Sequence, residues 1–155
     1  MTRSTISKSV LGMTLLAAGI GTCFAGGDLE KKIAYARSAA PVSVGAGATV
    51  VIDGEVVAEG NNGWTCLPDT MPGDGAALCI DAVWGEMMAA VGAKQPYKAT
   101  SLGISYMLLG EPEGSGVSNS TPYHEDPVHA HDYVETGPHI MVILPKEMLE
   151  GITTD

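Results

Sequence analysis

The sequence predicts an α+β fold: a small antiparallel or mixed sheet with two helices on one face and one disulfide. Two segments have the apolar spacing of helices. Two short apolar segments flank Asp53-Gly54, a pair typical of hairpin turns. Two later apolar segments, bounded by glycine or proline, are predicted to be strands. Helix, hairpin, helix, strand, long loop and strand is the order of an α+β domain.

The first 25 residues have the order of a cleavable secretory signal. A basic stretch precedes an apolar run and a small-residue ending: Arg3 and Lys8, then Val10 to Gly21, then Cys23-Phe24-Ala25. The apolar run is shorter than the roughly 20 residues that cross a bilayer as a helix. We therefore expect cleavage after Ala25, no stable membrane anchor, and a single α+β domain, residues 26–155, in the periplasm or outside the cell. Lipidation of Cys23 and an uncleaved anchor are the alternatives.

The charge of the expected mature chain narrows the class of partner. Loss of residues 1–25 leaves 18 acidic and six basic residues, a net charge of −12. Such a domain repels phosphate backbones and anionic lipid head groups, so we expect no nucleic acid as a partner. An acidic surface also keeps a protein soluble, so the charge identifies no partner by itself.

The first elements follow from spacing and turn chemistry. Apolar residues recur at helical spacing between Leu29 and Ala40, which predicts a helix with Asp28 as its N-cap and its end before Pro41. The segments 48–52 and 55–59 then form the two strands of the predicted hairpin.

The segment 60–77 is rich in turn-forming residues and predicts a long loop. Cleavage after Ala25 leaves two cysteines, Cys66 and Cys79, and an even pair in an oxidising compartment predicts a disulfide. This bridge would stabilise the fold by about 3 kcal/mol on the chain-entropy model. Two buried free thiols are the alternative, and the pair lacks the C-x-x-C spacing of many metal sites.

The second half of the chain supplies a helix, two strands and a polar loop. Residues 78–91 return to helical spacing, and Gly92 is placed to end that helix. The segments 102–109 and 140–144 predict strands, and 111–138 predicts a polar loop. The methionines of these elements lie on apolar faces, which favours core packing over a copper(I) site; they are Met87, Met88, Met107 and Met141.

All four histidines lie in one polar window, and they are His124, His129, His131 and His139. In an extended segment His129 and His131 face the same side, so both imidazoles can reach one ion. His124 or a nearby carboxylate would complete a site for zinc, copper or nickel, with His139 as a further ligand. The simpler interpretation is a solvated loop whose histidines bind nothing.

Four blocks of the sequence resemble a family of uncharacterised exported bacterial proteins. They are Asn62-Gly63-Trp64-Thr65-Cys66-Leu67-Pro68-Asp69, Asp81-Ala82-Val83-Trp84, Gly103-Ile104-Ser105-Tyr106-Met107-Leu108 and Gly137-Pro138-His139-Ile140-Met141-Val142. The resemblance implies no activity. It implies that relatives continue with another β-like segment after the position of Asp155, and so a C-terminal truncation of this chain.

Known catalytic motifs are mostly absent from the sequence. Ser105 lacks the second glycine of a G-x-S-x-G elbow, and Pro127 would break the helix that an H-E-x-x-H motif requires. The leading hypothesis is therefore a non-enzymatic exported domain that binds a small molecule or a partner protein. A metal-binding module on the histidine window and a hydrolase with an unrecognised site are the alternatives.

Overall fold

The computed structural model describes residues 26–121 and 124–152. The elements follow in chain order: α1 (Gly26–Arg37), α2 (Val42–Gly45), β1 (Thr49–Ile52), β2 (Glu55–Ala58), β3 (Thr65–Leu67), β4 (Leu78–Ile80), α3 (Ala82–Gly92), β5 (Gly103–Met107), β6 (Val117–Ser118), the 3-10 helix η1 (Pro127–His129), β7 (Tyr133–Val134), β8 (His139–Ile143) and the 3-10 helix η2 (Lys146–Met148). The α+β class is confirmed.

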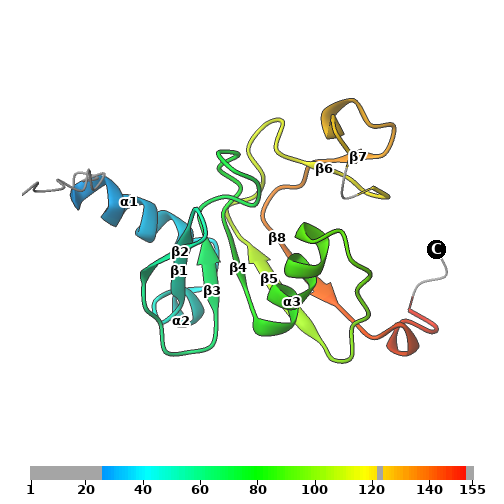
Figure 1. Cartoon of the computed structure of the whole chain (residues 1–155), viewed down its shortest axis with the longest axis horizontal. Coiled ribbons are helices and arrows are strands. Elements are labelled where there is room, and N and C mark those ends of the chain that lie inside the picture. Colours follow the sequence, from blue (N-terminus) through cyan, green and yellow to red (C-terminus); the bar gives the residue numbers. More distant parts are fainter. Residues whose placement is uncertain (1–25, 122–123, 153–155) are drawn as a thin grey trace, which may run out of the picture.

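One mixed sheet organises these elements (Figure 1). Its strand order is β2-β1-β3-β4-β5-β8, and β6 pairs with β7 in a separate two-stranded sheet. The β1–β3 pair is parallel and the other pairs are antiparallel. Among the described strands, β2 and β8 are therefore the two edges of the large sheet.

The predicted hairpin is present. Asp53 and Gly54 have φ angles of 52° and 80°, the two positive values that a type I′ turn requires. β1 and β2 pair on either side of this turn, with a register irregularity between Val50 and Val51.

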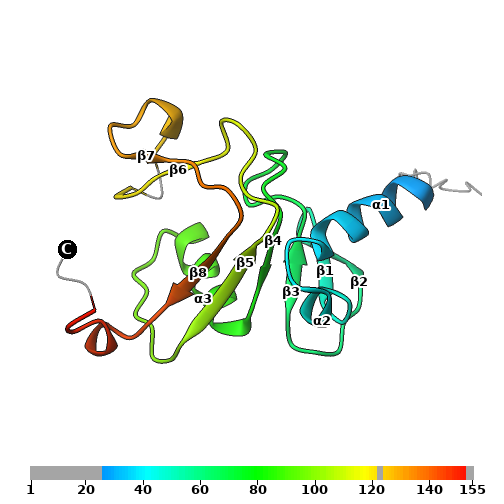
Figure 2. The same ribbon diagram turned by 180° about the vertical axis from the view of Figure 1, so that it is seen from behind.

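The two longer helices lie on opposite faces of the sheet, instead of on one face as the sequence suggested. Side chains alternate between faces along a strand. On β4, Cys79 packs in the core beneath α1, whereas Leu78 and Ile80 pack with Trp84 of α3. In Figure 1 α3 lies in front of the sheet and α2 behind it, and Figure 2 shows the reverse.

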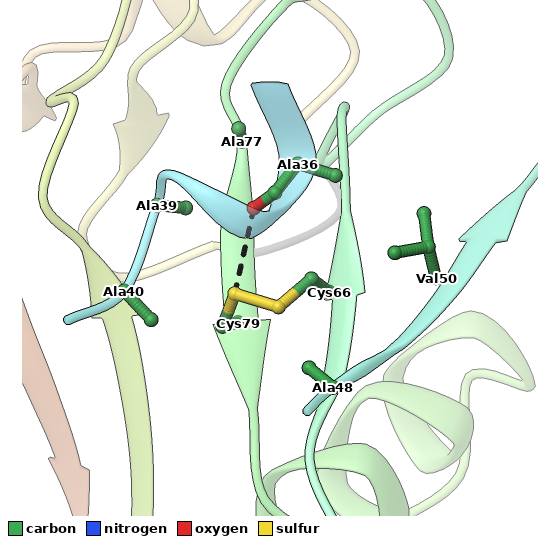
Figure 3. Packing of buried hydrophobic residues seen from close by; sticks show 8 residues of the cluster. All are labelled: Ala36, Ala39, Ala40, Ala48, Val50, Cys66, Ala77 and Cys79. Atoms are coloured by element: carbon green, nitrogen blue, oxygen red, sulfur yellow. Dashed lines mark hydrogen bonds between the residues drawn. A yellow bond between two sulfur atoms is a disulfide. The ribbon is translucent and has the colours of Figure 1, made fainter. Parts of the chain in front are cut away.

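The core beneath α1 is built from small residues around the disulfide (Figure 3). Cys66 and Cys79 are directly opposed on β3 and β4 and are bonded, which confirms the predicted pairing. Cys79 Sγ lies 3.4 Å from the backbone oxygen of Ala36. This is a packing contact, because a disulfide sulfur has no proton to donate. Val50 and five alanines complete the core, and the small alanine side chains let the end of α1 approach the sheet closely: Ala36, Ala39, Ala40, Ala48 and Ala77.

The core beneath α3 contains larger side chains. Leu78, Trp84 and Met107 are buried there, and Met87, Met88 and Met141 pack against them, in line with the predicted packing role of the methionines. Asp81 caps the helix, because its carboxylate accepts hydrogen bonds from Trp84 N at 2.8 Å and from Ile104 N at 2.7 Å. The second bond ties the start of α3 to β5.

Several predicted boundaries were wrong. α1 already includes Asp28, so this residue lies in the first helical turn and is not the N-cap. The predicted loop 60–77 contains β3, and the predicted helix 78–91 starts only after the strand β4. Gly92 is the last residue of α3, but the left-handed residue that follows a helix end is Lys94, with φ 53°.

Residues 1–25, which contain the expected signal, and residues 153–155 lie outside the described residues. Within the part of the chain that the structure describes, no helix has the length and apolar character needed to cross a membrane.

Candidate functional site

The histidine window lies mostly in a small lobe at one end of the sheet, formed by β6, β7 and η1 (Figure 1). The predicted loop 111–138 is therefore partly structured. Val117 pairs with Val134 and Ser118 with Tyr133, so the lobe is closed by a two-stranded ladder.

The premise of the metal prediction, an extended segment through His129 and His131, was wrong. His129 is the last residue of η1, because Pro127 begins this 3-10 turn with a fixed φ. Its Nδ1 lies 2.8 Å from the Asp126 carboxylate, and this hydrogen bond lowers the pKa of Asp126. Both side chains are largely exposed, so the pair contributes little stability.

His124 and His139 make separate local contacts, and neither contact involves His129 or His131. His124 Nδ1 accepts a hydrogen bond from Asp126 N at 3.1 Å, and His139 Nδ1 lies 2.7 Å from the Gly137 carbonyl oxygen. Over residues 26–121 and 124–152, no three or more histidine, cysteine or acidic side chains are grouped to hold a metal ion. The metal site on His124, His129, His131 and His139 stays a prediction.

The hydrolase hypothesis required a hydroxyl within hydrogen-bond reach of a histidine. In the described chain the hydrogen bonds of the histidine side chains go to Asp126 and to the Gly137 carbonyl. The Ser118 hydroxyl donates instead to Asp132, at 2.9 Å. Among residues 26–121 and 124–152, no serine, threonine or tyrosine hydroxyl is hydrogen-bonded to a histidine, and the hydrolase hypothesis stays a prediction.

The polar residues of the lobe hold its backbone in place. The Asp132 carboxylate accepts hydrogen bonds from Ser120 N at 2.7 Å and from the Ser118 hydroxyl, and these bonds lower the pKa of Asp132 to about 2. Glu135 accepts from Gly114 N and from the Tyr133 hydroxyl, both at 2.6 Å. The bond to Glu135 raises the pKa of Tyr133 and lowers that of Glu135. Asp132 and Glu135 therefore hold the backbone of this segment in place.

A second candidate site is the apolar face of β5 and β8 on the α1 side of the sheet, called here the β5–β8 face. Ile140 is opposite Tyr106 and Val142 is opposite Ile104, so the four side chains share one face. Ile140 and Val142 are 54% and 53% exposed. Figure 2 shows β5 and β8 toward the viewer with α3 behind them. No described helix covers this face at β8.

An aromatic pair extends the β5–β8 face toward the centre of the sheet. The rings of Trp64 and Tyr106 are 5.3 Å apart between centroids and tilted by 44°. Both side chains are half-buried and pack against the core beneath α1. This contact holds Tyr106, the cross-strand neighbour of Ile140, against Trp64.

The outer edge of β8 is also free of a strand partner among the described residues. β8 pairs with β5 through five consecutive residues without a bulge, from Met107↔His139 to Gly103↔Ile143. It contains no charged residue. The opposite edge strand, β2, begins with Glu55, is followed by Glu59, and pairs across a register irregularity. Charges and bulges protect edge strands from pairing, and β8 lacks both.

An open hollow of about 340 Å³ lies beside α1 and α2. Arg37 lines it, but Nε and Nη2 of Arg37 donate to the Ala48 carbonyl oxygen at 3.2 and 2.8 Å. The guanidinium therefore serves to connect α1 to the start of β1. Apart from Arg37 and Ser38, alanine and valine line the hollow, which leaves few polar groups to orient a ligand.

The β5–β8 face was not predicted from the sequence. Its signal was a continuous apolar run without charge, residues 140–144, in which Ile140 and Val142 stand on one side of the strand and Met141 and Ile143 on the other. The apolar run predicted the strand, but it does not tell which side a helix covers.

Comparison with protein-family models, curated proteins and solved structures finds no match. The resemblance to exported bacterial proteins therefore stays a prediction. The function is inferred below from the geometry of this chain.

Proposed function

We propose that this protein is an exported, non-enzymatic binding domain that recognises a partner protein through the β5–β8 face. The observation that carries the proposal is the pair of half-exposed aliphatic side chains, Ile140 and Val142, beside the fixed Trp64–Tyr106 pair. Contiguous exposed apolar surface is costly in water and marks interaction sites in soluble proteins.

The shape of the surface favours a protein over a small molecule as the partner. Small ligands bind in concave sites that remove most of their surface from water. The β5–β8 face is one side of an open sheet, whose exposed residues stand on the edge strand. A protein partner covers such a surface with a complementary apolar area and excludes water from its centre.

The Cys66–Cys79 disulfide supports export of the domain, because disulfides persist in oxidising compartments and are rare in the cytosol. The basic, apolar and small-residue order of residues 1–25 supports the same localisation, periplasmic or extracellular.

Site-specific photocrosslinking in the exporting cell tests the proposal. A photoreactive amino acid at Val142 or Ile140 should form a discrete adduct, because these side chains would lie in the interface. Val56 on β2 is the matched control, since it is 54% exposed on the opposite edge of the same sheet. Adducts of equal yield at Val56, or none at Val142 and Ile140, would refute the proposal.

A further inference from the structure

We propose that β8 accepts an extended segment of the partner as a seventh strand of the sheet, and that this segment has alternating apolar residues and a net positive charge. The inference rests on the proposed function, because it uses the β5–β8 face. It adds the mode of binding and the chemistry of the partner.

The backbone of β8 is prepared for strand addition. Antiparallel pairing with β5 uses the hydrogen-bonding groups on one side of β8, and the groups on the other side point away from the sheet. An unpaired edge of this kind binds extended peptides through main-chain hydrogen bonds. β2 has the same type of free edge, but Glu55 and the irregular register of its hairpin oppose addition there.

The side chains of β8 explain why the added segment should alternate. In an added strand every second side chain stands on the face of Ile140 and Val142, about 5 Å from its cross-strand neighbour. Apolar residues at these positions would cover the two half-exposed side chains. The alternate residues of the added strand stand on the opposite face of the sheet, beside Met141 and Ile143.

The charge around β8 selects the sign of the partner. Residues 103–152, which contain β5 and β8, include eight acidic residues and one basic residue, Lys146. Lys98 pairs with Glu147 at 3.7 Å, so this part of the molecule has a net charge of −6. Complementary charge speeds association and suppresses wrong partners. A second copy of this chain would bring the same negative charge to the edge, so the charge disfavours self-pairing through β8.

The test is a titration of the protein purified from the exported fraction with three synthetic nine-residue peptides. The first alternates valine with lysine, the second alternates valine with glutamate, and the third is the lysine peptide with proline at its central valine. Proline removes a backbone donor and prevents regular strand pairing. Fluorescence is recorded in a Trp84→Phe background, in which Trp64 is the remaining tryptophan; because Trp64 lies against Tyr106, its emission reports binding at the β5–β8 face.

We expect the lysine peptide to bind at least tenfold more tightly than either of the others, and less tightly as salt screens the charges. Val142→Lys should weaken that binding at least tenfold, whereas Val56→Lys, at an equally exposed position on β2, should leave it within twofold. Equal binding of the three peptides, or an unchanged affinity of Val142→Lys, would overturn the inference. A dimer in light scattering that Val142→Lys dissociates would overturn it in favour of a second copy.

The crosslinking experiment separates this inference from the proposed function. Discrete adducts at Val142, together with no preference for the lysine peptide, would overturn strand addition by a basic segment and retain the binding face. Absence of both results would overturn the two proposals together.

Discussion

Loss of the Cys66–Cys79 disulfide should destabilise the protein by a large part of its folding free energy. The bridge joins directly opposed residues of β3 and β4 with a sequence separation of 13. Closing a loop of this length in the unfolded chain stabilises the native state by about 3 kcal/mol on the chain-entropy model. Single domains have total stabilities of about 5–15 kcal/mol.

Replacement of both cysteines should cost more than reduction. Both side chains are fully buried in the alanine-rich core beneath α1. Cys66→Ala with Cys79→Ala removes two sulfur atoms that no neighbouring large side chain can replace. Each buried atom of this size contributes about 1 kcal/mol, so the double variant should lose about 5 kcal/mol.

Urea denaturation followed by tryptophan fluorescence measures both effects. For a urea dependence of about 1–3 kcal/mol per M, reduction should lower the midpoint by roughly 1–3 M. Met71→Ala is the control, because Met71 is 64% exposed in the loop between the cysteines and its truncation should change stability by no more than about 0.5 kcal/mol. Equal midpoints for the oxidised and reduced protein would refute the account of this core.

Three further predictions concern the N-terminus of the protein, Asp132 in the lobe of β6, β7 and η1, and the histidines. Mass spectrometry of the exported protein should find an N-terminus at Gly26; a chain that starts at Met1 would contradict signal cleavage. Because hydrogen bonds lower the pKa of Asp132 to about 2 from the usual 3.8, the carboxylate stabilises the lobe above pH 3.8 and this contribution is lost as the pH falls toward 2. NMR of the Ser120 amide should follow that transition, and a midpoint at pH 3.8 or above would contradict the assignment. In calorimetric titrations with zinc, copper(II) and nickel, a metal site would show binding tighter than about 10 μM that is lost in His129→Ala/His131→Ala; affinity unchanged by these substitutions would exclude these residues as ligands.

Local chemistry predicted the elements whose signals lie within a few residues. Asp53-Gly54 specifies its own turn, the alternation that predicted β5 lies within residues 102–109, and the apolar run that predicted β8 lies within residues 140–144. β3 was missed because Thr65–Leu67 has only three residues, and its partners on β1 and β4 are distant in sequence.

Boundaries failed where two apolar elements adjoin. The apolar residues of β4, Leu78–Ile80, come just before those of α3. The sequence therefore predicted one helix that includes the strand. The distinguishing signal was Asp81, a typical N-cap residue, whose carboxylate accepts from Trp84 N.

The candidate sites depended on three-dimensional information. Spacing alone suggested that His129 and His131 share a face, but Pro127 begins a 3-10 turn that ends at His129. The β5–β8 face exists because α1 and α3 pack on opposite sides, with α1 over β1, β3 and β4. Neither the strand order nor the side that each helix covers is encoded in a local pattern.

Amide hydrogen exchange of β8 with and without the valine–lysine peptide tests directly whether β8 accepts an added strand. Roughly half of the β8 amides face away from β5 in an antiparallel ladder and lack a strand partner in the described sheet. We expect the peptide to slow amide exchange within residues 140–143 and to leave the exchange rates of Val56 and Val57 of β2 unchanged. Unchanged exchange in β8, or equal protection of β2, would contradict the assignment of β8 as the binding edge.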